Sequence, residues 1–371
     1  MAEKKIGKQT VKFEKCPYVI GSAAVGGEKE GAGPMRDWFD FILEDDMNGE
    51  KTWEKAESKM LKDAMLMALK KSGREKKEID LVLSGDLLNQ IMSSSFMARD
   101  LHLPFLGLYG ACSTMTESLL LGSMLTDGGF AHNIIVGASS HFCTAERQFR
   151  MPLEHGNQRP PSAQWTATAA GAMIVSEKKS DLSKLGAVDG TAGSGRAPAE
   201  LYNIRVDCGT IGKIIDAGVK DANQMGSAMA PAAVDTILNH LEDTGRTLSY
   251  YDMVLTGDLG YIGKDIASDL LIDAGLPESD VRQRYDDCGT MMYDREAQDV
   301  HGGGSGCGCS ASIFSGNIIR RLRNGQLKRV LLLSTGAMLS TISPFQGESI
   351  PGIAHAVVLE TCKDQAGPVQ F

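Results

Sequence analysis

The sequence predicts an α/β protein made of two similar halves. Strand-sized apolar runs alternate with segments of helical period along most of the chain. One unit also recurs, because residues 73–87 match residues 245–259 without a gap and eight of the fifteen pairs are identical. Two such halves should pair into a layered body with pseudo-twofold symmetry and mostly parallel sheets.

The first half, residues 1–180, opens with alternating apolar and small residues that predict a strand over 16–27. Apolar residues with helical period predict a helix that Gly73 ends. Short continuous apolar runs predict the buried strands that follow. The expected elements after the first strand are the helix over 56–71 and strands over 79–84, 133–138 and 171–177.

The second half, residues 227–371, repeats this order. Its helix, over 229–241, carries Pro231, which is tolerated in a first helical turn. Residues 181–226 between the halves are expected to form a crossover segment. The expected elements here are strands over 251–256, 330–337 and 354–360 in the second half, and a weak strand over 185–188, a Gly-rich turn over 190–195 and a helical patch over 211–222 in the crossover.

A strand-to-helix turn presents Cys112 after an apolar stretch and before a predicted helix that runs to Met124. A helix N-terminus lowers the pKa of a thiol and can hold an anion. The turn therefore suits a nucleophile or an anion pocket, and a buried inert thiol is the third possibility. The alignment of the halves pairs this turn with residues 285–291, so that Cys288 is the duplicate of Cys112 and is expected to be structural.

The composition argues against several classes of function. The chain has 371 residues and a formal charge of −9, which disfavours nonspecific nucleic-acid binding and provides no polybasic membrane patch. Charged residues interrupt every long apolar window, so no membrane span is expected. Residues 1–5 are charged and no apolar segment follows them, which argues against a secretory signal. The eight cysteines are therefore expected as reduced thiols.

The Ala111-Cys112-Ser113 turn before a helix, within duplicated α/β halves, resembles the thiolase superfamily, and most nearly the β-ketoacyl synthase III type, over essentially the whole chain. The resemblance implies a layered αβαβα body and a homodimer formed through a sheet edge. It also implies that Cys112 matches the acyl-accepting thiol of that family. Gly336 would supply an oxyanion-hole amide beside the amide of Cys112.

Two departures from the family pattern argue against catalysis. Condensing enzymes of this family carry a histidine after the first strand of the second half, but residues 256–261 contain none. They carry an asparagine or histidine before the next helix, where this chain has the Gly-rich turn 301–310. Asp258, as an anion, would oppose the charge that such enzymes stabilise. We therefore expect a noncatalytic protein. The alternative is an acyl-CoA-dependent acyltransferase or condensing enzyme with Cys112 as nucleophile and His301 or His141 as base.

At a finer level, the Cys112 turn, the Gly257-Asp258-Leu259-Gly260 turn and residues 301–309 resemble a sporulation branch of this superfamily. That resemblance implies binding of dipicolinic acid, pyridine-2,6-dicarboxylate, during its uptake into the developing spore. It implies partner proteins of the same sporulation group and a peripheral location at the cytoplasmic face of the inner membrane of the forespore or spore. No cofactor is expected apart from calcium carried with dipicolinate, which Asp258 could reach.

A rigid dianion such as dipicolinate suits backbone amides, hydroxyls and an arginine fork. Glycines let backbone amides approach a ligand closely, and Arg147 and Lys264 are candidates for the counter-charge. Cys307 and Cys309 lack a second ligand pair, so no metal site is expected. The expected ligand-binding residues are Cys112, His141, Arg147, Gly257, Asp258, His301, Gly302, Gly303, Ser305 and Gly336.

Overall fold

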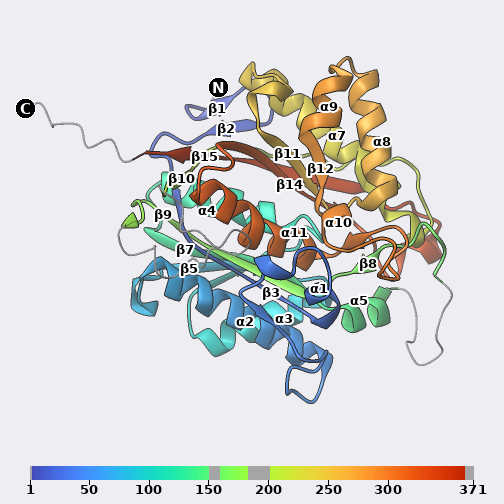
Figure 1. Ribbon diagram of the computed structural model, residues 1–371, viewed down its shortest axis with the longest axis horizontal. Helices are drawn as coiled ribbons and strands as arrows, with labels where there is room; N and C mark the ends of the chain where they lie inside the picture. The colour runs from blue at the N-terminus through green and yellow to red at the C-terminus, as the bar shows by residue number, and fades with distance from the viewer. Residues whose placement is uncertain (1, 150–158, 183–200, 364–371) are drawn as a thin grey trace, which may run out of the picture.

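Five alternating layers of helix and sheet form the fold in the computed structural model, which describes residues 2–149, 159–182 and 201–363 (Figure 1). Apolar cores fill the interfaces between the layers, and the αβαβα arrangement is confirmed. None of the helices in these ranges combines the length and the apolar composition needed to cross a bilayer. The outer helices are α2 (Trp53–Ser72) and α3 (Met92–Leu101) on one side and α7 (Met225–Thr244) and α8 (Gly260–Asp273) on the other, and the central helices are α4 (Thr114–Asp127) and α11 (Cys307–Ile313), which continues into α12 (Ile319–Arg323).

Each half contributes five strands in the same spatial order. In the first half this order is β6 (Phe105–Gly107), β5 (Leu81–Gly85), β7 (Asn133–Ser140), β9 (Ala169–Ser176) and β3 (Tyr18–Gly26), and in the second half it is β12 (Tyr285–Asp287), β11 (Met253–Gly257), β14 (Arg329–Ala337), β15 (Gly352–Cys362) and β10 (Asn203–Thr210). A short antiparallel ladder joins β3 to β10 at Val19 and Ile204. The two orders therefore mirror each other across this seam, and the predicted duplication is confirmed.

The last strand of each half runs against its neighbours. β5 pairs in parallel with β6 and β7, and β11 pairs in parallel with β12 and β14. β9 and β15 are antiparallel to both of their neighbours. The prediction of mostly parallel sheets is therefore wrong. Parallel neighbours need a long crossover connection, usually a helix, whereas the chain between β14 and β15 forms only one short 3-10 turn (Ser343–Gln346).

Matching caps explain part of the internal repeat. α2 starts at Thr52, whose side chain accepts a hydrogen bond from the Lys55 amide, and it ends at Gly73 with a left-handed backbone (φ +69°). α7 ends at Gly245 in the same conformation (φ +63°), which glycine adopts without steric cost. Because α7 begins at residue 225, Pro231 lies inside the helix and not in its first turn as expected.

The range 181–226, expected as a crossover, contributes a full strand to the sheet, since β10 pairs with β15 and β3. The helix expected over 211–222 does not form. The Ile211 amide donates to Gln9, and Ile215 exchanges backbone hydrogen bonds with Gly352, so these backbone groups already have partners outside a helix. The strand expected over 185–188 and the turn over 190–195 lie outside the described residues.

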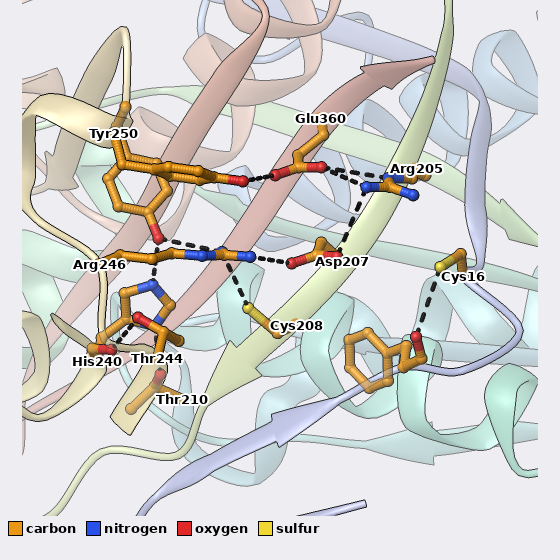
Figure 2. A network of polar contacts seen from close by, with 12 residues as sticks. Cys16, Arg205, Asp207, Cys208, Thr210, His240, Thr244, Arg246, Tyr250 and Glu360 are labelled. Carbon is orange, nitrogen blue, oxygen red and sulfur yellow. Dashed lines mark hydrogen bonds and ion pairs between the residues drawn. The ribbon is translucent and has the colours of Figure 1, made fainter. Parts of the chain in front are cut away.

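A polar network ties the end of α7 to β10 and β15 (Figure 2). The Arg246 guanidinium pairs with Asp207 at 2.7 Å, and the neighbouring Arg205 pairs with Glu360 at 2.7 Å. Burial opposes ionisation of Asp207, but the hydrogen bond and charge of Arg246 lower its pKa below the ordinary value. Burial lowers the pKa of His240 to about 3, so this imidazole is neutral. The network is structural and lies among the strands of the second half.

Candidate functional site

Cys112 lies in the turn between β6 and α4, as the sequence predicts, and is buried. The Ser113 hydroxyl donates to the Gly110 carbonyl, and the Thr114 hydroxyl donates to the Ala111 carbonyl, both at 2.7 Å. Ala111 adopts a left-handed backbone (φ +49°), which residues other than glycine rarely do. These constraints hold the thiol at the N-terminal end of α4, where the helix dipole favours an anion.

The end of β14 packs directly on this turn. The Ser334 amide donates to the Thr116 hydroxyl at 3.1 Å. A Cβ atom at Gly336 would collide with the Gly110 carbonyl oxygen and would lie 3.2 Å from the Ser113 nitrogen. The fold thus brings Gly336 and the Cys112 turn into contact, and the absence of a side chain at Gly336 makes the contact possible.

A second thiol faces Cys112 from the other half of the molecule. Cys307 begins α11, and its thiol donates to the Ala111 carbonyl at 2.9 Å. Burial, followed by the hydrogen bond with Cys112, raises the pKa of Cys307 well above its ordinary value. The sequence alignment paired Cys112 with Cys288, but α10 (Cys288–Met291) ends after one turn. The central helix of the second half begins at Cys307, because α10, the following loop and the short strand β13 (Gly304–Ser305) separate it from β12.

Asp258 lies near this pair at the end of β11. Its side chain is completely buried, its backbone is left-handed (φ +78°), and the Ser310 hydroxyl donates to its Oδ2 atom at 3.1 Å. Its Oδ1 atom has no hydrogen-bond partner among the described residues. Burial, the nearby Cys112 thiol and Asp287 raise the pKa of Asp258 well above its ordinary value. The surroundings of Asp258 therefore disfavour the anion assumed from the sequence, relative to a carboxyl group in water.

A cavity of about 40 Å³ opens beside Cys112. Because a buried water needs roughly 10–15 Å³ of such volume, the cavity has room for about three waters. The chain in the described ranges contributes no lysine, arginine or histidine to its lining. The lining residues are Leu87, Tyr109, Ala111, Cys112, Ala145, Glu146, Phe149, Thr166, Met225, Ser305, Ala337 and Leu339.

The two cations suggested by the sequence pair with acids outside this lining. Arg147 forms an ion pair with Glu54 and lies over the Trp53 ring. Lys264 pairs with Asp286 at 2.7 Å. Each of these two side chains has an ion-pair partner outside the lining, so the structure does not bring either charge to the cavity.

The backbone amides of the Gly-rich turn, residues 301–310, donate hydrogen bonds within the protein. The Gly302 amide donates to the Ala163 carbonyl at 2.8 Å, and the Gly303 amide donates to the Val300 carbonyl at 3.1 Å. These glycines permit close backbone packing, since a Cβ at Gly302 would lie 2.7 Å from the Ser162 carbonyl oxygen. Of the turn residues expected in the site, Ser305 reaches the cavity lining.

The two histidines considered as bases are bound elsewhere. His141 contacts the Asp46 carbonyl through Nε2 at 2.8 Å, and burial lowers its pKa. His301 contacts the Pro160 carbonyl and the Asp299 carboxylate. His155 lies outside the described residues, and none of the six histidines within them lines the cavity.

Several residues of the site carry little or no signal in the sequence. Cys307 was visible only as part of a weak Cys-x-Cys pattern, and Glu146 and Thr166 carried no signal. The Thr166 hydroxyl donates to Glu146 at 3.2 Å, so these two polar groups of the lining satisfy each other. Their helix, α5 (Phe142–Phe149), and strand, β8 (Trp165–Thr166), meet only in the folded chain.

The fold and the thiol turn define a thiolase-like protein. A 3-oxoacyl-[acyl-carrier-protein] synthase III from Aquifex aeolicus superposes with a TM-score of 0.51 at 12% identity, and the match covers 93% of this chain and 99% of that chain. An OleA variant of Xanthomonas campestris superposes with a TM-score of 0.57 at 13% identity, covering 94% of this chain and 97% of that chain. At this level of identity the likeness shows the fold alone.

Sequence comparison resolves the family. The model of the stage V sporulation protein AD (SpoVAD) family matches residues 7–360. The stage V sporulation protein AD of Bacillus subtilis (strain 168) is 42% identical over 354 residues, which cover 95% of this chain and 97% of that protein. This chain belongs to the stage V sporulation protein AD family. It is therefore a sporulation protein with a thiolase-like fold.

Proposed function

We propose that this protein binds dipicolinic acid without turning it over and serves its uptake into the developing spore. The observation that carries the proposal is the group that faces Cys112. Cys307 is a buried thiol whose pKa is raised, and a protonated thiol cannot accept a proton as a general base must. The turn thus keeps a helix N-terminus suited to an anion, while the described lining offers no imidazole.

The polar groups around the cavity suit a carboxylate ligand. Tyr109 and Ser305 bring hydroxyls to the lining, and a hydroxyl can donate to a carboxylate. A pyridine ring with two carboxylates is larger than three waters. Binding therefore requires the lining side chains to move apart.

Calorimetry with dipicolinate and the full chain tests the proposal. The wild type should bind saturably, and Cys112→Met, which fills the cavity, should bind at least about ten-fold more weakly. Cys16→Ser, at a half-buried cysteine outside the cavity lining, is the matched control and should bind like the wild type. Absence of saturable binding, or equal binding by Cys112→Met, would contradict the proposal.

Calcium carried with the ligand is a separate part of the proposal. If Asp258 reaches the metal of a calcium chelate, affinity should rise with calcium in the wild type and lose that dependence in Asp258→Asn. Equal affinities with and without calcium in both proteins would remove this part and leave dipicolinate binding intact.

An acyltransferase or condensing enzyme is the second candidate, because Cys112 lies at a helix N-terminus against Gly336. Incubation with acyl-CoA followed by peptide mapping separates the two functions. Acylated Cys112 together with a released product would establish the enzyme. His155→Ala would then test the histidine that lies outside the described residues.

We also propose a homodimer through the open edge of the first half. β6 ends the strand order, and Met92, Phe96, Leu106 and Tyr109 on and around it are exposed apolar residues. Sedimentation should give a dimer for the wild type and a monomer for Leu106→Asp. Phe345→Asp, at an exposed phenylalanine of the second half, should remain a dimer.

The proposed location is peripheral, at the cytoplasmic face of the inner membrane of the forespore or spore, held there by other proteins of the stage V sporulation A group. Membrane fractions from cells that lack those proteins should lose this chain. Its retention there would contradict the proposal.

A further inference from the structure

One carboxyl group and two hydroxyls gather on one part of the cavity lining and are called here the oxygen cluster. Glu146, Thr166 and Ser305 form it, and each of them is buried and lines the cavity beside Cys112. Among the described residues, this lining holds one acidic side chain, Glu146, and no lysine, arginine or histidine. The charge of the lining is therefore set by Glu146.

Contacts among α5, β8 and β13 fix the oxygen cluster in place. α5 and β8 lie side by side (Figure 1), and the Phe142 ring of α5 stacks on Trp165 of β8 with ring centroids 3.8 Å apart. The Thr166 hydroxyl donates to Glu146 Oε1 at 3.2 Å. β13 pairs in parallel with β8, so that Ser305 lies beside Thr166. The three oxygen-bearing side chains are thus held together by the fold.

The oxygen cluster opposes a free dicarboxylate ligand. Glu146 is only 6% exposed, so solvent screens its charge weakly. Like charges a few ångströms apart repel strongly where water is largely excluded. A dianion that enters the cavity meets this carboxylate, and the described lining offers no positive side chain to offset it. Such a ligand binds weakly unless it brings a positive charge with it.

The same oxygens suit a hard cation that arrives with the ligand. Ca²⁺ binds carboxylates and neutral oxygens, takes six to eight ligands and accepts flexible geometry. Dipicolinate offers one edge with two carboxylates and a ring nitrogen, which leaves several positions of the ion open. Glu146 can supply a charged oxygen to these positions, and Thr166 and Ser305 can supply neutral ones. Mg²⁺ fits less well because it requires a strict octahedron and retains several waters.

We propose that Glu146, together with Thr166 and Ser305, makes the cavity select the calcium chelate of dipicolinate over the free dianion. The inference rests on the proposed function, since it names the form of the ligand that the site takes. Glu146 attracts the calcium of the chelate and repels the metal-free ligand, so one side chain produces both effects. Asp258 is not required for this selection, because it lies outside the described lining.

Calorimetry on the full chain compares calcium dipicolinate at excess Ca²⁺ with dipicolinate in EDTA. The wild type should bind the calcium chelate at least about ten-fold more tightly. Glu146→Gln keeps the size of the side chain and an acceptor for the Thr166 hydroxyl but removes the charge. This variant should bind the chelate at least about ten-fold more weakly than the wild type, and it should bind metal-free dipicolinate more tightly. A packing defect alone would weaken both forms.

Glu30→Gln is the matched control, because Glu30 is another buried glutamate, 1% exposed, and lies outside the cavity lining. It should bind both forms as the wild type does. Pyridine-2,6-dicarboxamide provides a second measurement that needs no variant, should Glu146→Gln not fold. This analogue has the shape of dipicolinate but no charge, so the wild type in EDTA should bind it more tightly than dipicolinate.

The outcomes separate this inference from the proposed function. Failure of the wild type to bind either form of dipicolinate would contradict both. Saturable binding that is equal with Ca²⁺ and with EDTA would overturn the inference alone, as would an equal loss of both forms in Glu146→Gln or a preference for dipicolinate over its diamide in EDTA. Calcium dependence that is lost in Asp258→Asn and kept in Glu146→Gln would also overturn it.

Discussion

Gly336→Ala tests whether the contact between β14 and the Cys112 turn supports the site. The added carbon would lie roughly 1 Å inside the van der Waals limit of the Gly110 carbonyl oxygen. The backbone of residue 336 fixes the position of the added carbon, and the Gly110 oxygen belongs to the backbone, so neither atom can rotate away. Overpacking of this kind costs about 1–3 kcal/mol, and we expect about 2 kcal/mol of lost stability together with a displaced Cys112 turn.

Urea unfolding followed by tryptophan fluorescence measures the stability change, and peptide mapping after limited alkylation measures access to Cys112. Gly128→Ala is the control. The added carbon there would meet the ring of Phe130, which is 82% exposed and can move, so stability should change by less than about 0.5 kcal/mol. Equal stabilities for Gly336→Ala and the wild type, with unchanged alkylation of Cys112, would refute the reasoning.

Two further predictions concern buried charge elsewhere. Burial raises the pKa of Glu30 from 4.5 to about 7, so its stabilising contribution is complete below pH 4.5 and is lost as the pH rises through 7. Between pH 5 and pH 8 the ionisation of Glu30 should remove up to about 3 kcal/mol of unfolding free energy. In urea titrations, Glu30→Gln should make the free energy of unfolding depend less on pH. The same pH dependence in the variant and the wild type would contradict the prediction. Arg246→Ala leaves the buried Asp207 with only its longer contact to Arg205, at 3.8 Å, and should cost about 3 kcal/mol. Lys8→Ala, from an ion pair exposed on both sides, should cost less than about 0.5 kcal/mol in the same assay, and equal costs would show that burial does not set the difference.

Local pattern was sufficient for most of the fold. The strands and helices of both halves follow from apolar periodicity, which reflects contacts within one element. Gly73 marked the end of one helix in the sequence, because a left-handed cap depends on the residue at that position. The matching cap at Gly245 is a finding of the structure. The Cys112 turn and its approach by Gly336 were also accessible, the second through family resemblance.

The sequence pattern did not show in which direction each strand runs, or whether a connecting segment forms a helix. An apolar run predicts a strand but not which way it runs, so the antiparallel β9 and β15 were missed. Residues 211–222 have helical composition in part, yet their backbone bonds to Gln9 and Gly352. Such partners are separated by many residues, and only the folded chain selects them.

The sequence by itself determined the class of fold, the duplication and the turn that presents Cys112, because these depend on residues close together along the chain. Tertiary structure decided the character of the site. It set Cys307 opposite Cys112, paired Arg147 and Lys264 with acids outside the cavity lining, and buried Asp258, which raises the pKa of this carboxyl group. These properties depend on burial and on groups from distant segments, since the free energy of a charge is fixed by what surrounds it in space.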